Sequence, residues 1–282
     1  MKFTDKIKST DGTIIAYHKM GTGPSIVIVH GGMELGSSHL DLANTLSQKY
    51  TVYLYDRRDR GASVAIASSR YCMQEEISDL MAMIQLSQAK YIFAVSAGAL
   101  ITLQFLLTNF SVEKVMLYEP PLSINGSINF KYMRRFDKEI ASQKILDAFI
   151  TTMRGSKMAP SIMKMIPRFI LRKGMKKMGE KDNHDIDALG KLIPTFKHDV
   201  QLAVETQDTL DSYKVIKTQT LLIGGGKSPK YLKTALHHLQ ETLPHASTVV
   251  LKKCDHIGSS NKQAGGNPDL VAQAIFMFLQ PA

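Results

Sequence analysis

The segment Ala94-Val95-Ser96-Ala97-Gly98-Ala99 decides the fold of this 282-residue chain. It ends an apolar run at residues 91–95, typical of a buried strand, and begins a helical pattern over residues 97–107. The small residues around Ser96 allow a sharp turn and a close approach of strand and helix. Such a turn lifts a Ser hydroxyl above the sheet edge and points the next backbone N–H, that of Ala97, toward a developing oxyanion. Ser96 is therefore a candidate nucleophile, with a buried Ser in an ordinary strand-to-helix turn as the alternative.

On both sides of this turn, short apolar runs alternate with helical patterns. Near-continuous apolar strands separated by helices are typical of a parallel sheet covered on both faces, so the predicted fold class is α/β. Strands are predicted at residues 13–17, 25–29, 51–55, 91–95, 114–118, 219–224 and 247–251, and helices at 37–46, 73–86, 97–107, 231–243 and 268–279.

The alternation stops after Pro120-Pro121. Residues 122–200 are helical in pattern and rich in Met, and they hold 16 Lys and Arg against 8 Asp and Glu, most of the chain's net charge of +10. We therefore predict a core of residues 1–121 and 201–282 and a helical insertion of residues 122–200. Its methionines suit an apolar pocket or a mobile lid, although helix packing is their more common use. Its basic stretch, residues 168–177, would attract anionic ligands or a lipid surface, or would form a solvated face.

Composition narrows the function classes. A chain that is 44% hydrophobic and 21% charged is neither globally disordered nor collagen-like. Only two cysteines, Cys72 and Cys254, exclude a disulfide scaffold and favour a reducing compartment. We expect a cytoplasmic protein without stable membrane insertion, because no signal peptide is recognised and the longest apolar stretch is interrupted by polar residues. No zinc-finger spacing or aromatic-and-basic RNA signature accompanies the positive charge, so no nucleic-acid partner is expected.

Two further loops carry candidate chemistry. His30-Gly31-Gly32 ends an early strand, where a flexible loop offers a second backbone N–H, that of Gly32, to an oxyanion. Cys254-Asp255-His256 follows the last strand and places His256 at the same sheet edge, although a lone loop His is usually a surface residue. A Ser turn, a Gly-rich loop and a late His in this order are together much more specific than any one of them.

With Asp56-Arg57-Arg58-Asp59-Arg60-Gly61-Ala62-Ser63 and Glu119-Pro120-Pro121, these landmarks resemble the α/β-hydrolase superfamily over nearly the whole chain. The resemblance implies an eight-stranded, mostly parallel sheet with helices on both faces and a helical cap inserted after the sixth strand. It also implies Ser96 as nucleophile and His256 as general base. Two positions depart from the pattern. Ala94 replaces the usual elbow Gly and is nearly as small, whereas Asp59 stands where relatives usually carry Gly, without a functional account.

Relatives commonly place the acid of the catalytic triad after the seventh strand, yet no Asp or Glu occurs between Asp211 and Glu241. The best replacement is Glu119, directly after the sixth strand, and some lactone hydrolases of the superfamily look similar in this respect. A carboxylate there holds the imidazole in its productive tautomer and stabilises the imidazolium. Asp255 is the rival acid, but neighbouring side chains on a loop generally diverge. The alternative for Glu119 is a cap of the sheet edge, paired with a basic residue.

Other signals are weaker than they look. Gly226-Lys227-Ser228 imitates the end of a phosphate-binding loop, but Leu221 replaces the required Gly, so no nucleotide cofactor is expected. His237-His238 lies on a helical pattern with no Cys or carboxylate recognised at ligand spacing, and no metal is expected. In the loop of residues 56–63, we expect Asp56 to hydrogen-bond loop backbone and the arginines to be solvated.

The sequence therefore predicts a cofactor-free serine hydrolase, a monomer or homodimer, acting on a small, fairly apolar ester or lactone. Ser96, His256 and Glu119 would form its triad, and the N–H groups of Gly32 and Ala97 its oxyanion hole. One alternative uses the same triad for perhydrolysis, C–C hydrolysis or acyl transfer. The other is a non-catalytic ligand-binding module on the hydrolase scaffold, which only the missing acid after the seventh strand favours.

Overall fold

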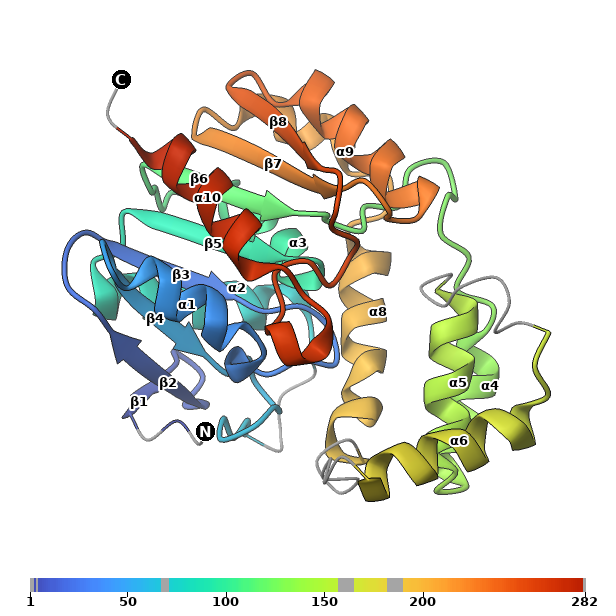
Figure 1. The fold of residues 1–282 in the computed structure, drawn as a ribbon. Coiled ribbons are helices and arrows are strands. Elements are labelled where there is room, and N and C mark those ends of the chain that lie inside the picture. The colour runs from blue at the N-terminus through green and yellow to red at the C-terminus, as the bar shows by residue number, and fades with distance from the viewer. Residues whose placement is uncertain (1–2, 4, 67–70, 157–164, 182–189, 281–282) are drawn as a thin grey trace.

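The computed structural model describes residue 3 and residues 5–66, 71–156, 165–181 and 190–280. Its centre is one eight-stranded sheet in the order β1-β2-β4-β3-β5-β6-β7-β8 (Figure 1). The pairs β1-β2 and β2-β4 are antiparallel and the other neighbours are parallel, which confirms the predicted fold class. The strands are β1 (Asp5–Lys8), β2 (Ile14–Met20), β3 (Ser25–Val29), β4 (Thr51–Tyr55), β5 (Tyr91–Val95), β6 (Lys114–Tyr118), β7 (Gln219–Gly225) and β8 (Ala246–Leu251).

The strand β1 was not predicted. Its four residues, DKIK, contain a single apolar side chain and are mostly exposed at the sheet edge. A strand with one partly buried apolar residue, Ile7, gives no apolar run, although it pairs antiparallel with Ile14–Met20.

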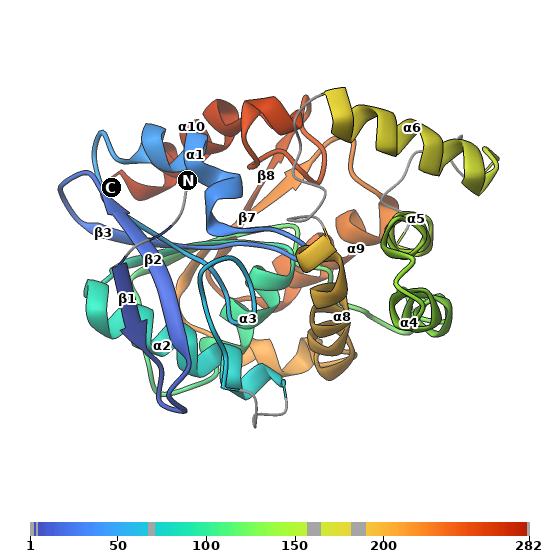
Figure 2. The ribbon, with the colours of Figure 1, turned by 90° about the horizontal axis from the view of Figure 1, so that it is seen from below.

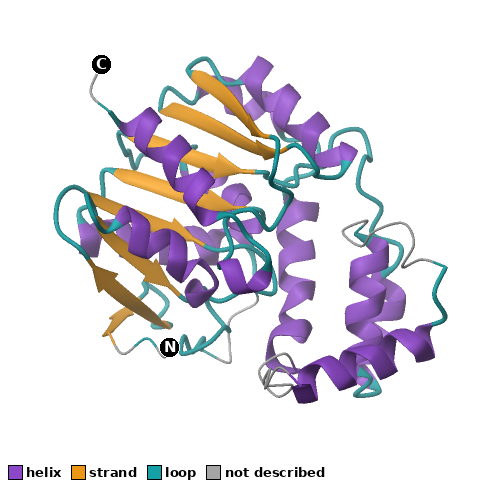
Figure 3. Cartoon of the chain, viewed as in Figure 1, coloured by secondary structure: helices purple, strands orange, loops and turns teal. Residues whose placement is uncertain are grey.

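Helices cover both faces of the sheet (Figure 3). Because successive strand residues point to opposite faces, Val27 and Val29 pack in one apolar core, while Ile26 and Ile28 pack in the other. The first core is completed by α2 (Met73–Ser87), α3 (Ala97–Phe105) and α9 (Lys230–Thr242), and the second by α1 (Leu40–Leu46) and α10 (Pro268–Leu279). Short 3-10 turns are η1 (Gly36–His39), η3 (Ile193–Thr195), η4 (Leu210–Val215) and η5 (Lys262–Ala264).

The segment between β6 and β7 is helical in its described part. Its helices are α4 (Met133–Ala141), α5 (Ile145–Gly155), α6 (Arg168–Lys181) and α8 (Phe196–Glu205). The first three stand away from the sheet, and α8 lies between them and the core (Figure 2). A small apolar cluster of Phe136, Ala148 and Ile193 joins α4, α5 and η3. The boundary predicted after residue 200 falls inside α8, whose Leu202 and Ala203 pack in the core.

Among the described residues, no helix combines the length and the apolar character that crossing a bilayer requires.

Candidate active site

Ser96 occupies a tight turn between β5 and α3. Its backbone has φ 51° and ψ −119°, a left-handed conformation that is strained for a residue with a side chain. The turn is held because the Ser96 N–H donates to the Tyr118 carbonyl at 2.9 Å, extending the pairing of β5 with β6. At Gly98 a Cβ would lie 2.4 Å from the Val29 carbonyl oxygen, so only glycine lets α3 begin this close to β3. The sequence-predicted turn thus presents the Ser hydroxyl at the carboxyl edge of the sheet.

His256 and Glu119 reach Ser96 from two other strand ends. His256 Nε2 lies 3.1 Å from Ser96 Oγ, and His256 Nδ1 lies 2.8 Å from Glu119 Oε2. An ionised carboxylate only accepts hydrogen bonds, so Nδ1 carries the ring proton and Nε2 is left to accept from the Ser96 hydroxyl. This is the arrangement that a general base needs in order to take a proton from Ser96.

Glu119 is fixed by its backbone and by both carboxylate oxygens. It follows β6 with φ 48°, and it is 1% exposed. Its second oxygen, Oε1, accepts from the Gly225 N–H at 2.6 Å, and neither oxygen contacts a Lys or Arg among the described residues. The rival Asp255 instead accepts from the Ile257 N–H at 3.1 Å within its own loop. Of the two predicted acids, the structure therefore brings only Glu119 to His256.

Tyr118 supports the His256 loop, a contact that the sequence reasoning missed. Its hydroxyl donates to the Asp255 carbonyl, and a Cβ at Gly258 would collide with that hydroxyl. Burial, followed by the charge of Glu119, raises the pKa of Tyr118, which keeps the hydroxyl protonated and able to donate. The available signal was a Tyr after three apolar residues at the end of a strand, since a buried phenol needs a hydrogen-bond partner.

The two residues whose amides are predicted for the oxyanion hole lie at the same cavity as Ser96. Gly32 and Ala97 both line the cavity that contains Ser96 and His256. The Gly31–Gly32 loop packs against Ser96, because a Cβ at Gly31 would lie 3.2 Å from Ser96 Cβ. Within the described residues, neither the Gly32 N–H nor the Ala97 N–H donates to a protein acceptor. Both donors are thus free for a ligand oxygen.

A cavity of about 720 Å³ opens above Ser96, between the core and the helical insertion. The insertion lines it mainly with apolar side chains, among them Phe130, Phe149, Met153 and Phe196. Met153 is one of the insertion's methionines, whereas Met158 and Met163 lie outside the described residues. The polar groups at the cavity include Glu34, Asp199 and Lys227.

The loop after β4 differs from its prediction. Asp56 accepts from the Gly36 and Ala62 N–H groups at 3.0 Å each, as expected. The expectation that the arginines are solvated is wrong, because Arg57, Arg58 and Arg60 are at most 1% exposed.

Long-range ion pairs compensate these buried charges. Arg58 pairs with Asp79 at 2.7 Å, while Arg57 and Arg60 both donate to Asp199 Oδ1, at 3.0 and 2.8 Å. Arg57 also pairs with Glu76 at 2.7 Å. These acids lie on α2 and α8, outside the loop that carries the arginines, so no local sequence pattern predicts the pairing. Asp59 is the exposed exception, with its carboxylate 4.0 Å from His198.

The weaker motifs behave as structural features. In Gly226-Lys227-Ser228, the three N–H groups donate to the carbonyls of Leu251, Cys254 and Gly225, so the turn uses its own donors. The expectation that no carboxylate lies at ligand spacing from His237 and His238 is wrong, since Glu241 follows them by four and three residues and lies 3.5 Å from both rings on the exposed face of α9. Across the described residues, no group of three or more His, Cys, Asp or Glu side chains is arranged to hold a metal ion.

Comparison with known proteins adds the family. A model of the alpha/beta hydrolase fold matches residues 24–262. Among curated proteins, the uncharacterized hydrolase YraK of Bacillus subtilis (strain 168) is 34% identical over 115 residues, 39% of this chain and 42% of that protein. The match thus spans less than half of this relative's length.

Solved structures resemble the whole chain. An alpha/beta hydrolase from Sphaerobacter thermophilus DSM 20745 has a TM-score of 0.79 at 25% identity, covering 98% of this chain and 100% of that one. A bromoperoxidase from Bacillus anthracis has a TM-score of 0.72 at 18% identity, with coverage of 98% and 100%. A thermophilic esterase from Thermogutta terrifontis has a TM-score of 0.66 at 17% identity, with coverage of 98% of each chain. The last two similarities concern the fold alone.

Proposed function

The chain belongs to the alpha/beta hydrolase family, and on that premise we propose that it is a serine hydrolase cleaving a small, fairly apolar carboxylic ester or lactone. The observation that carries the proposal is the contact series from Ser96 through His256 to Glu119, with gaps of 3.1 and 2.8 Å. A nucleophile, a base and an orienting acid within hydrogen-bond reach are the parts that acyl transfer needs.

In the proposed reaction, Ser96 Oγ attacks the substrate carbonyl while His256 Nε2 takes the hydroxyl proton. The carbonyl oxygen becomes an oxyanion that accepts from the Gly32 and Ala97 N–H groups. The imidazolium, stabilised by Glu119, then gives its proton to the departing alkoxide, and the acyl group remains on Ser96. A water molecule activated by His256 attacks this ester in turn, and release of the acid restores Ser96.

The apolar wall of the cavity supports the substrate class. Aromatic side chains of the insertion face Ser96 across a space large enough for a small ester. We propose that the insertion acts as a cap, excluding bulk water and selecting the acyl group. The esterase from Thermogutta terrifontis, which shares the fold, is consistent with ester substrates.

Perhydrolysis is a second candidate, favoured by the fold shared with a bromoperoxidase. It requires the same acyl-enzyme, with hydrogen peroxide in place of water as the acceptor. Product analysis in the presence of peroxide separates the two: a peracid identifies perhydrolysis, and the carboxylic acid alone identifies hydrolysis.

A fluorophosphonate probe tests the proposal directly. Intact-mass measurement should show one adduct on the wild type and none on Ser96→Ala, because the probe reacts with an activated Ser hydroxyl. Ser156→Ala is the matched control, since Ser156 also lines the cavity but contacts neither His256 nor Glu119. Absence of an adduct on the wild type, together with no turnover across an ester and lactone panel, would refute the serine hydrolase and favour the ligand-binding module.

A further inference from the structure

The peptide between Gly31 and Gly32 carries one of the two proposed oxyanion donors. In a trans peptide the C=O and the N–H point in opposite directions, so whatever holds the Gly31 carbonyl also aims the Gly32 N–H. The carbonyl accepts from His30 Nδ1 at 2.8 Å and from Arg57 Nη1 at 3.2 Å. Both donors are fully buried.

The tautomer of His30 follows from its partners. Its Nε2 lies 3.0 Å from the backbone N–H of Arg57, which can only donate, so Nε2 is the acceptor and Nδ1 carries the proton. Burial, together with the charges of Arg57 and Arg60, lowers the pKa of His30 well below its usual value. The ring is therefore neutral, and the lasting positive charge at this carbonyl is the guanidinium of Arg57.

Arg57 is itself held on three sides. Its Nε and Nη2 form a forked pair with Glu76, and its Nη1 donates to Asp199 of α8 as well as to the Gly31 carbonyl. The backbone N–H of Gly31 itself donates to Glu34 Oε2 at 2.8 Å. A Cβ at Gly32 would lie 2.8 Å from the Asp199 carboxylate, so glycine is required for the peptide to fit here.

We propose that Arg57 is a positioning residue of the reaction, holding the Gly31–Gly32 peptide so that the Gly32 N–H faces the oxyanion. The inference rests on the proposed function, since the oxyanion forms only if Ser96 attacks a carbonyl. The guanidinium acts in two ways. It fixes the direction of the peptide, and its charge draws electrons toward the carbonyl oxygen, which makes the N–H on the far side a stronger donor.

Arg58 provides a matched control for burial alone. It lies next in the same loop, is 1% exposed and pairs with a buried carboxylate, that of Asp79. Among the described residues, its side chain donates to Asp79, Asp11 and the Glu75 carbonyl and not to the Gly31–Gly32 peptide. Arg58→Lys and Arg57→Lys thus weaken the same kind of buried ion pair. Only Arg57→Lys also removes a hydrogen bond from the Gly31–Gly32 peptide.

The test compares both variants with the wild type on an ester that the wild type hydrolyses. We expect Arg57→Lys to lower kcat about tenfold to a hundredfold with KM within about threefold of the wild type. A trifluoromethyl ketone, which forms an oxyanion on Ser96, should bind more weakly by the factor lost in kcat/KM. Arg58→Lys should lower the melting temperature with both kinetic constants within about twofold of the wild type.

Two outcomes overturn the inference: a folded Arg57→Lys with near-wild-type kcat, or an equal loss of kcat in Arg58→Lys. If Arg57→Lys does not fold, Arg57→Met/Glu76→Gln replaces it. That double variant removes one buried charge of each sign and leaves Asp199 paired with Arg60. The same kinetic loss is expected from it, and its absence is equally decisive. A wild type without adduct or turnover overturns the proposed function itself, a result distinct from either of these.

Discussion

At the scale of single residues, the site depends on donors and acceptors that match one to one. Glu119 meets two N–H donors, those of Gly225 and His256, with its two carboxylate oxygens. Only an ionised acid can accept from both, since an amide offers one acceptor and one donor. The unusual position of the acid therefore still meets the requirement that orients an imidazole.

Glu119→Gln tests this matching. If the new amide oxygen accepts from Gly225, its NH₂ group faces His256 Nδ1 and forces the ring proton onto Nε2, which then cannot accept from Ser96. We expect kcat to fall about 10⁴-fold while the melting temperature stays within a few degrees of the wild type, about 3 °C. Steady-state kinetics and thermal unfolding measure both quantities. Asp255→Asn is the control, with kcat near the wild type, and a near-wild-type rate in Glu119→Gln would exclude it as the orienting acid.

Several residues of the candidate site could be predicted from the sequence. The side chains that hold them in place could not. Ser96, His256, Glu119 and Gly32 each follow a strand, so the shared carboxyl edge of a parallel sheet was enough to group them. Tyr118 and the arginines act through contacts with residues distant along the chain, which no local pattern encodes.

At the scale of elements, the turn from β5 to α3 depends on the absence of a side chain. The carbonyls of Val29 and His30 occupy the space where a Cβ of Gly98 would lie, at 2.4 and 2.6 Å. Both obstacles are backbone atoms, which cannot rotate away as a flexible side chain would. The start of α3, and with it the Ala97 N–H, is therefore fixed against the end of β3.

Gly98→Ala should push α3 away from β3. We expect it to lower the free energy of unfolding by about 1–3 kcal/mol, as overpacking of a core does, and to reduce kcat because the Ala97 N–H moves. Gly174→Ala on α6 is the control, since a Cβ there meets no atom within 4 Å. Urea unfolding gives the free energy of both variants, and equal stability of the two would contradict the argument.

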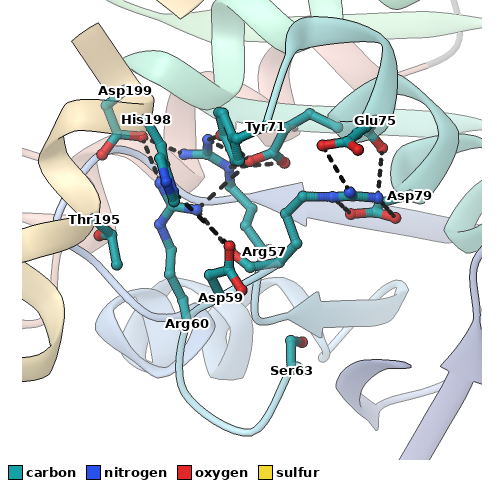
Figure 4. Close-up of polar contacts among 12 residues, drawn as sticks. Arg57, Asp59, Arg60, Ser63, Tyr71, Glu75, Asp79, Thr195, His198 and Asp199 are labelled. Carbon is teal, nitrogen blue, oxygen red and sulfur yellow. Dashed lines mark hydrogen bonds and ion pairs between the residues drawn. The ribbon is translucent and has the colours of Figure 1, made fainter. Parts of the chain in front are cut away.

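At the scale of the whole molecule, α8 joins the helical insertion to the sheet and its apolar core. Asp199 of α8 accepts from Arg57 and Arg60, and the neighbouring His198 stacks on Tyr71 with ring centroids 4.0 Å apart (Figure 4). Any movement of α8 would therefore act on the side chain that we infer to hold the oxyanion loop.

In the basic stretch of the insertion, residues 168–177, the arginines form ion pairs and the lysines are exposed. Arg168 and Arg172 pair with Asp147 at 3.3 and 2.8 Å, so they bind α6 to α5. The three lysines that follow, Lys173, Lys176 and Lys177, are exposed. Part of the positive charge that the sequence assigns to this segment thus serves internal packing.

The stacking of His198 on Tyr71 makes the contact between α8 and the core sensitive to pH. Burial, followed by the charge of Arg60, lowers the pKa of His198 to about 4, against a usual value of 6.5. Between these values the unfolded chain binds a proton at His198 that the folded chain does not, so stability falls as the pH falls through this window. The contribution of neutral His198 to the free energy of unfolding is intact above the usual pKa and is lost below about pH 4. The loss is at most about 3 kcal/mol.

His198→Gln should remove this dependence. We expect the free energy of unfolding to fall less steeply between about pH 7 and pH 4 in the variant than in the wild type, because the glutamine does not titrate. Urea unfolding across that range gives the two curves. Parallel curves would show that His198 gains its proton equally well in the folded chain.

The sequence by itself determined the α/β class, the strand ends that carry Ser96, His256 and Glu119, and the place of the helical insertion. Those features are local, because apolar periodicity and small residues at a turn act over a few positions. Only the tertiary structure decided that Arg57, Arg58 and Arg60 are buried and that Glu119, rather than Asp255, meets His256. A buried charge is tolerated only where opposite charges from other elements surround it, and that condition exists only once the chain has folded.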